Sequence, residues 1–151
     1  MLAMTLALTL TANMARADDF DDAAAALNNG DFATAFNLIK PLAERGYADA
    51  QYNLGVMYRL GNGVRKDDTE AVRWYRKAAD QGYALAQSNL GVMYQHGEGV
   101  IADDEEVVRW YRKAAEQGFA KAQSNLGRMY QYGKGVIADD KEAVRWYRKA
   151  A

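Results

Sequence analysis

The sequence repeats itself with a fixed period. The stretch AVRWYRKAA occupies residues 71–79 and returns, nearly unchanged, at 107–115 and 143–151, each time 36 residues later. Aligning residues 71–106 with residues 107–142 gives 28 identities in 36 positions without a gap. Tandem repetition at this period indicates stacked supersecondary units, each too small to bury its own apolar face. We therefore expect an array of units that share one continuous core.

Each period contains two helical patterns. The first reads AQYNLGVMY, AQSNLGVMY and AQSNLGRMY in the three units, beginning at residues 50, 86 and 122. The second is the AVRWYRKAA stretch, in which alanines, Trp74 and Tyr75 recur at the spacing of one helical face. The pattern predicts an all-α fold of stacked antiparallel helix pairs, with Trp74, Trp110 and Trp146 in the core.

The sequence also predicts where the second helix of each unit begins. Asp67, Asp103 and Asp139 each precede a glutamate by three residues, which is an aspartate version of the capping box. Within the first helix, a glycine recurs at residues 55, 91 and 127, although a glycine there costs about 1 kcal/mol relative to alanine. We expect a neighbouring helix to approach closely at these glycines, with the alanines of AVRWYRKAA as the contacts.

These motifs resemble the Sel1-like repeat, a relative of the tetratricopeptide repeat. The shared pattern is A-Q-x-N-L-G-x-M-Y, then G-x-G-V, then D-x-x-E-A-V-x-W-Y-x-K-A-A. The resemblance implies a right-handed α-solenoid with three repeats at 48–83, 84–119 and 120–151. It also implies an adaptor or scaffold for other proteins, often exported in bacteria. A cysteine-rich branch is linked to cell-wall or β-lactam compounds, but this chain has no cysteine.

Two segments precede the repeats. Residues 18–46 read as a capping helix pair similar to a tetratricopeptide unit, with helices at 19–28 and 32–45. Residues 1–17 combine an apolar run with Ala15-Arg16-Ala17, a small-x-small cleavage pattern, although no basic residue precedes the run. They predict a signal peptide and a periplasmic or secreted protein. A cytoplasmic adaptor is the alternative if these residues are not a leader.

A candidate binding surface follows from where the units differ. Along the first helix, the second and third units differ at Leu85/Lys121, Val92/Arg128 and His96/Tyr132, positions that fall on one helical stripe. The unvarying positions lie around the opposite side. We predict that the stripes of the stacked first helices form a groove for a protein or peptide segment. This predicted groove comprises Asp49, Tyr52, Asn53, Val56, Arg59, Leu85, Ser88, Asn89, Val92, Gln95, His96, Lys121, Ser124, Asn125, Arg128, Gln131 and Tyr132.

The asparagines of the groove allow two interpretations. Asn53, Asn89 and Asn125 recur at the same height of each unit and offer both donors and acceptors. They could hold the backbone of an extended peptide without reading its sequence. They could equally satisfy polar groups of the scaffold itself.

Composition narrows the function classes. Nineteen basic residues against twenty acidic ones argue against a nucleic-acid partner, and a lone histidine without cysteines argues against a metal site. No cofactor, catalytic residue or stable membrane insertion is expected. A non-enzymatic interaction scaffold is the leading hypothesis, and a cell-wall-acting or β-lactam-binding hydrolase-like protein of the envelope is the alternative. End-to-end association through the apolar face of the last helix is a further hypothesis.

Overall fold

The structure is a computed structural model that describes residues 18–151. A first helix covers residues 18–28. Seven helices follow: α2 Phe32–Glu44, α3 Ala48–Leu60, α4 Asp68–Asp80, α5 Ala84–His96, α6 Asp104–Glu116, α7 Ala120–Tyr132 and α8 Asp140–Ala150. No strand occurs within this described range. The predicted signal peptide over residues 1–17 lies outside the described residues.

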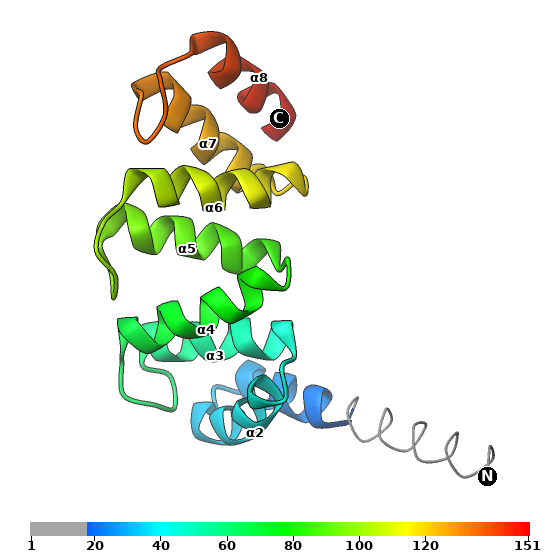
Figure 1. The fold of residues 1–151 in the computed structure, drawn as a ribbon. Coiled ribbons are helices and arrows are strands. Elements are labelled where there is room, and N and C mark those ends of the chain that lie inside the picture. Colours follow the sequence, from blue (N-terminus) through cyan, green and yellow to red (C-terminus); the bar gives the residue numbers. More distant parts are fainter. Residues whose placement is uncertain (1–17) are drawn as a thin grey trace, which may run out of the picture.

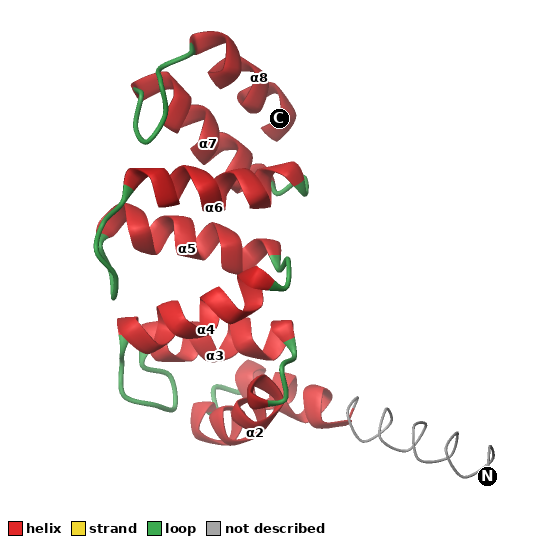
Figure 2. Ribbon diagram, in the orientation of Figure 1, coloured by secondary structure: helices red, strands yellow, loops and turns green. Residues whose placement is uncertain are grey.

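The helices form a right-handed α-solenoid, as the resemblance to the Sel1-like repeat implies. Consecutive helices pack against each other from α2 to α8, so α3 and α4, α5 and α6, and α7 and α8 are antiparallel pairs. Figure 1 shows the pairs stacked in chain order, with α2 and α8 at opposite ends of the array. The connections between consecutive helices alternate between short turns and longer loops, as Figure 2 shows. We call α3, α5 and α7 the first helices of the three units, and α4, α6 and α8 the second helices.

The tryptophans lie in the core, which confirms the prediction from their spacing. Trp74, Trp110 and Trp146 are only 4%, 1% and 6% exposed. Tyr75 and Tyr111 are each 1% exposed beside them. The burial of large aromatic side chains from every second helix supplies the hydrophobic stabilisation that a single pair lacks.

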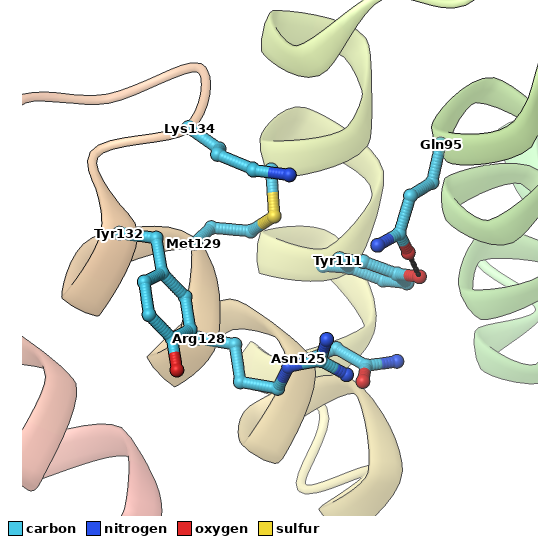
Figure 3. A pocket seen from close by; sticks show the side chains of 7 residues that line it. All are labelled: Gln95, Tyr111, Asn125, Arg128, Met129, Tyr132 and Lys134. Atoms are coloured by element: carbon cyan, nitrogen blue, oxygen red, sulfur yellow. Dashed lines mark hydrogen bonds between the residues drawn. The ribbon is translucent and has the colours of Figure 1, made fainter.

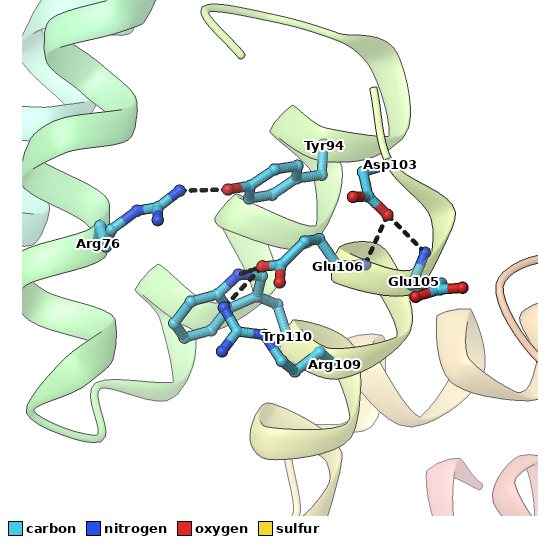
Figure 4. Close-up of polar contacts among 7 residues, drawn as sticks. All are labelled: Arg76, Tyr94, Asp103, Glu105, Glu106, Arg109 and Trp110. Atoms are coloured by element: carbon cyan, nitrogen blue, oxygen red, sulfur yellow. Dashed lines mark hydrogen bonds and ion pairs between the residues drawn. The ribbon is translucent and has the colours of Figure 1, made fainter. Parts of the chain in front are cut away.

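Each second helix begins at the predicted aspartate, but the cap is one-sided. The Asp103 carboxylate accepts hydrogen bonds from the backbone N–H groups of Glu105 and Glu106 at 3.0 and 3.1 Å (Figure 4). Glu106 does not reach back to the aspartate, because the Asp103 N–H donates to the carbonyl of Tyr94. Glu106 instead accepts from Arg109 at 2.7 Å and from the Trp110 indole N–H at 2.9 Å.

The close approach at the mid-helix glycines is present, but its partner was predicted wrongly. A Cβ built on Gly55 would lie 2.7 Å from the Tyr75 ring, and one on Gly127 would lie 2.8 Å from the Tyr147 ring. A Cβ on Gly91 would overlap Tyr111 in the same way. The contacts are tyrosine rings of the second helix rather than its alanines. A flat ring that packs directly on a helix backbone requires a glycine at the contact, as a closely packed alanine would.

Polar side chains fix the units in register. The buried amide of Gln87 donates to the carbonyl of Ala79 at 3.0 Å, and Gln51 and Gln123 make the same bond in their units. Gln117 then donates to Gln87 at 2.8 Å across 30 residues. These bonds satisfy groups at the helix ends that would otherwise be buried without partners.

Candidate binding surface on the first helices

Most of the positions that vary between units face outward, as the stripe predicts. Leu85, His96, Lys121, Arg128 and Tyr132 are exposed. The positions that do not vary on the same helices include alanines, leucines, glycines and methionines that are fully buried. The first helices therefore divide into a constant side that holds the stack and a variable side that meets solvent.

Ser88 is the exception, and its assignment to an accessible groove was wrong. Its exposed fraction is 2%, although Tyr52 and Ser124 at the equivalent positions are half-buried. The ring of Tyr52 packs beside the rings of Tyr75 and Tyr83, with ring centroids 5.8 and 5.3 Å away. Ser124 is also a serine, so side-chain length alone does not bury Ser88; Ser88 lies in the middle unit, which has a unit on either side. The helical angle places a residue on a stripe but says nothing about which neighbouring units cover that position.

The part of the predicted groove between the first two units is held by internal contacts. Arg59 of α3 pairs with Glu98 in the loop after α5, with 3.1 Å between the Arg59 Nη2 and Glu98 Oε2 atoms. Asp49 lies near the Tyr83 hydroxyl. Burial raises the pKa of Tyr83, and the negative charge of Asp49 adds to that rise.

Asn89 takes part in the scaffold at this place. Burial raises the pKa of Tyr75 to about 12, while a hydrogen bond with the side chain of Asn89 opposes the rise. Tyr75 comes from the preceding unit, so Asn89 links two units. This contact supports the structural interpretation of the asparagines for one of the three.

The predicted groove contains a small pocket between the second and third units. It is formed by side chains of α5, α6, α7 and the loop after α7 (Figure 3). The lining residues are Gln95, Tyr111, Asn125, Arg128, Met129, Tyr132 and Lys134. The Tyr111 hydroxyl donates to the Gln95 side-chain carbonyl at 3.0 Å. The structure thus brings together four residues of the predicted groove: Gln95, Asn125, Arg128 and Tyr132.

The other predicted residues lie along the same helices. Gln131 accepts from the Tyr147 hydroxyl at 2.8 Å, which repeats the bond between Tyr111 and Gln95 one unit later. Val56 and Val92 are half-buried and pack on the core. Asn53 and Ser124 are half-buried and do not line the pocket.

Three residues that line the pocket were not predicted. Tyr111 and Met129 belong to the apolar pattern, and only their positions at the edge of the core bring them to the pocket. Lys134 lies in the loop after α7, outside the helical stripe. The sequence did contain a signal for it, because position 134 differs from its equivalent, Glu98, in the preceding unit.

Neither a metal site nor a membrane span emerges within residues 18–151. The described histidine, aspartate and glutamate residues form no group of three that could hold a metal ion. No described helix has the length and apolar character needed to cross a bilayer.

Comparison with known proteins identifies the class to which this fold belongs. The family model described as the Sel1 repeat matches residues 48–83, 84–119 and 120–151. These three matches cover more than half of the chain, so the chain belongs to the Sel1 repeat family. Repeats of this family are in general protein–protein interaction modules.

Solved structures of the same kind are similar to this chain. A Sel1 repeat protein from Oxalobacter formigenes has a TM-score of 0.82 and 39% identity, over 85% of this chain and 53% of that one. The antigen c5321, described as protective and present in uropathogenic Escherichia coli strains, has a TM-score of 0.74 and 48% identity. That match covers 76% of this chain and 25% of c5321. Helicobacter pylori cysteine rich protein B has a TM-score of 0.59 and 25% identity, over 74% of this chain and 85% of that one.

A curated relative matches over a shorter stretch. The "DAP3-binding cell death enhancer 1" of Rattus norvegicus is 39% identical over 46 residues. These residues make up 30% of this chain and 9% of that protein.

Proposed function

We propose that this chain is a non-enzymatic scaffold that binds a segment of another protein along the predicted groove. One observation carries the proposal: the first-helix positions that differ between units are exposed or half-buried, apart from the buried Ser88, while most of the constant ones are buried. A stack needs only the buried side to be constant. Variation gathered on the outer side is what a surface that distinguishes among guests requires.

The chemistry of this surface supports a peptide-like guest. It combines aromatic side chains, such as Tyr52 and Tyr132, with amide and charged groups that point outward. Tyrosines and arginines are enriched among residues that dominate binding energy at protein interfaces. A hydrolase would need a nucleophile with a base beside it. The two serines of the predicted groove do not supply one, since Ser88 is buried and no contact pairs Ser124 with His96 within the described residues.

Selection from a phage-displayed random peptide library tests the proposal. The groove variant is Leu85→Ala/His96→Ala, because both side chains are exposed and their removal leaves the core intact. The matched control is Ile101→Ala/Ile137→Ala, which truncates two exposed side chains in the loops after α5 and α7. All three proteins should unfold within about 0.5 kcal/mol of one another.

Peptides selected on the unsubstituted protein should bind the groove variant roughly tenfold more weakly, a loss of about 1.4 kcal/mol, and bind the control with unchanged affinity. Failure to enrich any peptide, or equal affinity for both variants, would refute the scaffold function in this groove. Turnover of cell-wall fragments by the purified protein would favour the hydrolase instead.

We also propose that the chain is exported. Support comes from the apolar run followed by Ala15-Arg16-Ala17. Mass spectrometry of the protein recovered from its native cells should find a mature N-terminus at Asp18. An intact N-terminus on residues 1–17 would identify a cytoplasmic adaptor.

A further inference from the structure

The pocket can be compared with the equivalent place one repeat earlier in the same chain. The 36-residue repeat gives every pocket residue an equivalent one unit earlier, on the same scaffold. Tyr111, Asn125 and Met129 correspond to Tyr75, Asn89 and Met93, so these three residue types are the same at both places. The remaining positions change, and each change alters the charge or the size of the side chain.

The earlier location is bridged by an ion pair. Arg59 and Glu98 meet there at 3.1 Å, and their formal charges cancel. Val92 and His96 complete that location without adding a formal charge. At the later location, Gln95 replaces Arg59 and Lys134 replaces Glu98, so the same ion pair cannot form.

The later location is instead cationic and open. Arg128 stands where the earlier unit has Val92, so Arg128 and Lys134 together bring a formal charge of +2. Within residues 18–151, neither side chain takes part in an ion pair. Figure 3 shows Arg128 beside Asn125 and Lys134 across the pocket from them.

The neutral groups of the pocket also offer donors. The Gln95 carbonyl accepts from Tyr111, so its amide nitrogen remains as a donor. The side chain of Asn89 lowers the pKa of Tyr75 at the earlier location, whereas the side chain of Asn125 makes no hydrogen bond within the described residues. Two cations and two amide donors around one opening match a carboxylate, which only accepts hydrogen bonds.

We propose that this pocket, defined by Gln95, Asn125, Arg128 and Lys134, receives an aspartate or glutamate side chain of the peptide segment bound in the groove. The proposal rests on the proposed function and deepens it. The acidic residue fixes the position and direction of the guest, because the equivalent place one unit earlier is bridged by an ion pair and has no net formal charge. An extended segment therefore places its acidic residue against the third unit.

The upstream ion pair provides the test variant. Gln95→Arg/Lys134→Glu transplants the Arg59–Glu98 pair into the later unit, where the scaffold has the same repeat. This variant lowers the formal charge by one. Arg65→Gln, at an exposed loop position, lowers it equally and serves as the control. Thermal unfolding followed by circular dichroism checks that both variants fold like the unsubstituted protein.

Random-peptide phage selection on the three proteins gives the readout. The unsubstituted protein and Arg65→Gln should enrich Asp or Glu at one peptide position, and Gln95→Arg/Lys134→Glu should select peptides without that preference. A synthetic peptide from the selection should lose roughly tenfold in affinity when that residue is changed to its amide. The loss should shrink as the ionic strength rises from about 0.1 M to about 1 M, because salt screens charges at an exposed site.

The outcomes separate the two proposals. Peptides that bind the groove but show no acidic preference overturn the pocket assignment and leave the scaffold function standing. An acidic preference that persists in Gln95→Arg/Lys134→Glu has the same consequence. A peptide whose binding is competed away by a single-stranded oligonucleotide at equal concentration overturns the assignment in favour of a general anion site. Absence of any selected peptide refutes both proposals.

Discussion

The loop between the helices of each unit rests on the preceding unit, and a pair of glycines measures how much that contact matters. Gly97 and Gly99 lie in the same loop with nearly the same backbone conformation, at φ of +67° and +65°. A Cβ on Gly97 would find its nearest atoms at 3.6 Å. A Cβ on Gly99 would overlap the backbone carbonyl of Asp68, at the start of α4, and lie 2.6 Å from the Thr69 nitrogen.

The two alanine substitutions therefore differ in one respect. Both place a Cβ on a left-handed backbone, which costs about 1–2 kcal/mol. Both also restrict the unfolded chain, which offsets about 0.4–1 kcal/mol. Gly99→Ala alone must displace a helix backbone, and such overpacking costs about 1–3 kcal/mol. We expect Gly99→Ala to be less stable than Gly97→Ala by that last amount.

Urea unfolding followed by tryptophan fluorescence measures the difference, because Trp74 and Trp110 are buried on either side of the contact. The midpoint should fall slightly for Gly97→Ala and clearly further for Gly99→Ala. If the two variants unfold within about 0.5 kcal/mol of each other, the loop does not press on α4 and the reasoning fails.

Two further predictions concern the buried aromatic side chains. Trp110→Phe should lower the free energy of unfolding by about 2 kcal/mol more than Trp74→Phe. Of these two indoles, only that of Trp110 donates a hydrogen bond, to the Glu106 carboxylate. Equal losses in urea unfolding would contradict this prediction. Burial raises the pKa of Tyr75 and Tyr111 to about 12, so unfolded tyrosines lose their protons first as the pH passes 10. Stability should accordingly be full below pH 10 and decline between about pH 10 and 12, which denaturant midpoints across that range would detect.

The features that the sequence predicted correctly are the helices and their caps, which depend on the local spacing of residues. Helices were expected at 19–28 and 32–45, and the structure has them at residues 18–28 and Phe32–Glu44. The aspartate caps were expected at Asp67, Asp103 and Asp139, and all three side chains accept backbone N–H groups. These features depend on neighbours within one or two turns, so a sequence pattern is enough to specify them.

The errors arose where side chains of different helices meet. Gly91 was expected to contact alanines, but a tyrosine ring of α6 covers it. Ser88 was placed on an open stripe, but it is buried. A helical wheel gives the direction of a side chain, not its length or the shape of the surface opposite.

The sequence by itself determined the repeated helix pairs, the constant buried side and the variable outer side, because each follows from the spacing of residues along one helix and from the comparison of one unit with the next. Only the tertiary structure decided which charges meet. Arg59 and Glu98 are 39 residues apart and pair with each other, while Arg128 and Lys134 line a pocket at the equivalent place one unit later. That difference depends on the stacking of consecutive units, which brings a loop against a helix that precedes it by more than one full repeat.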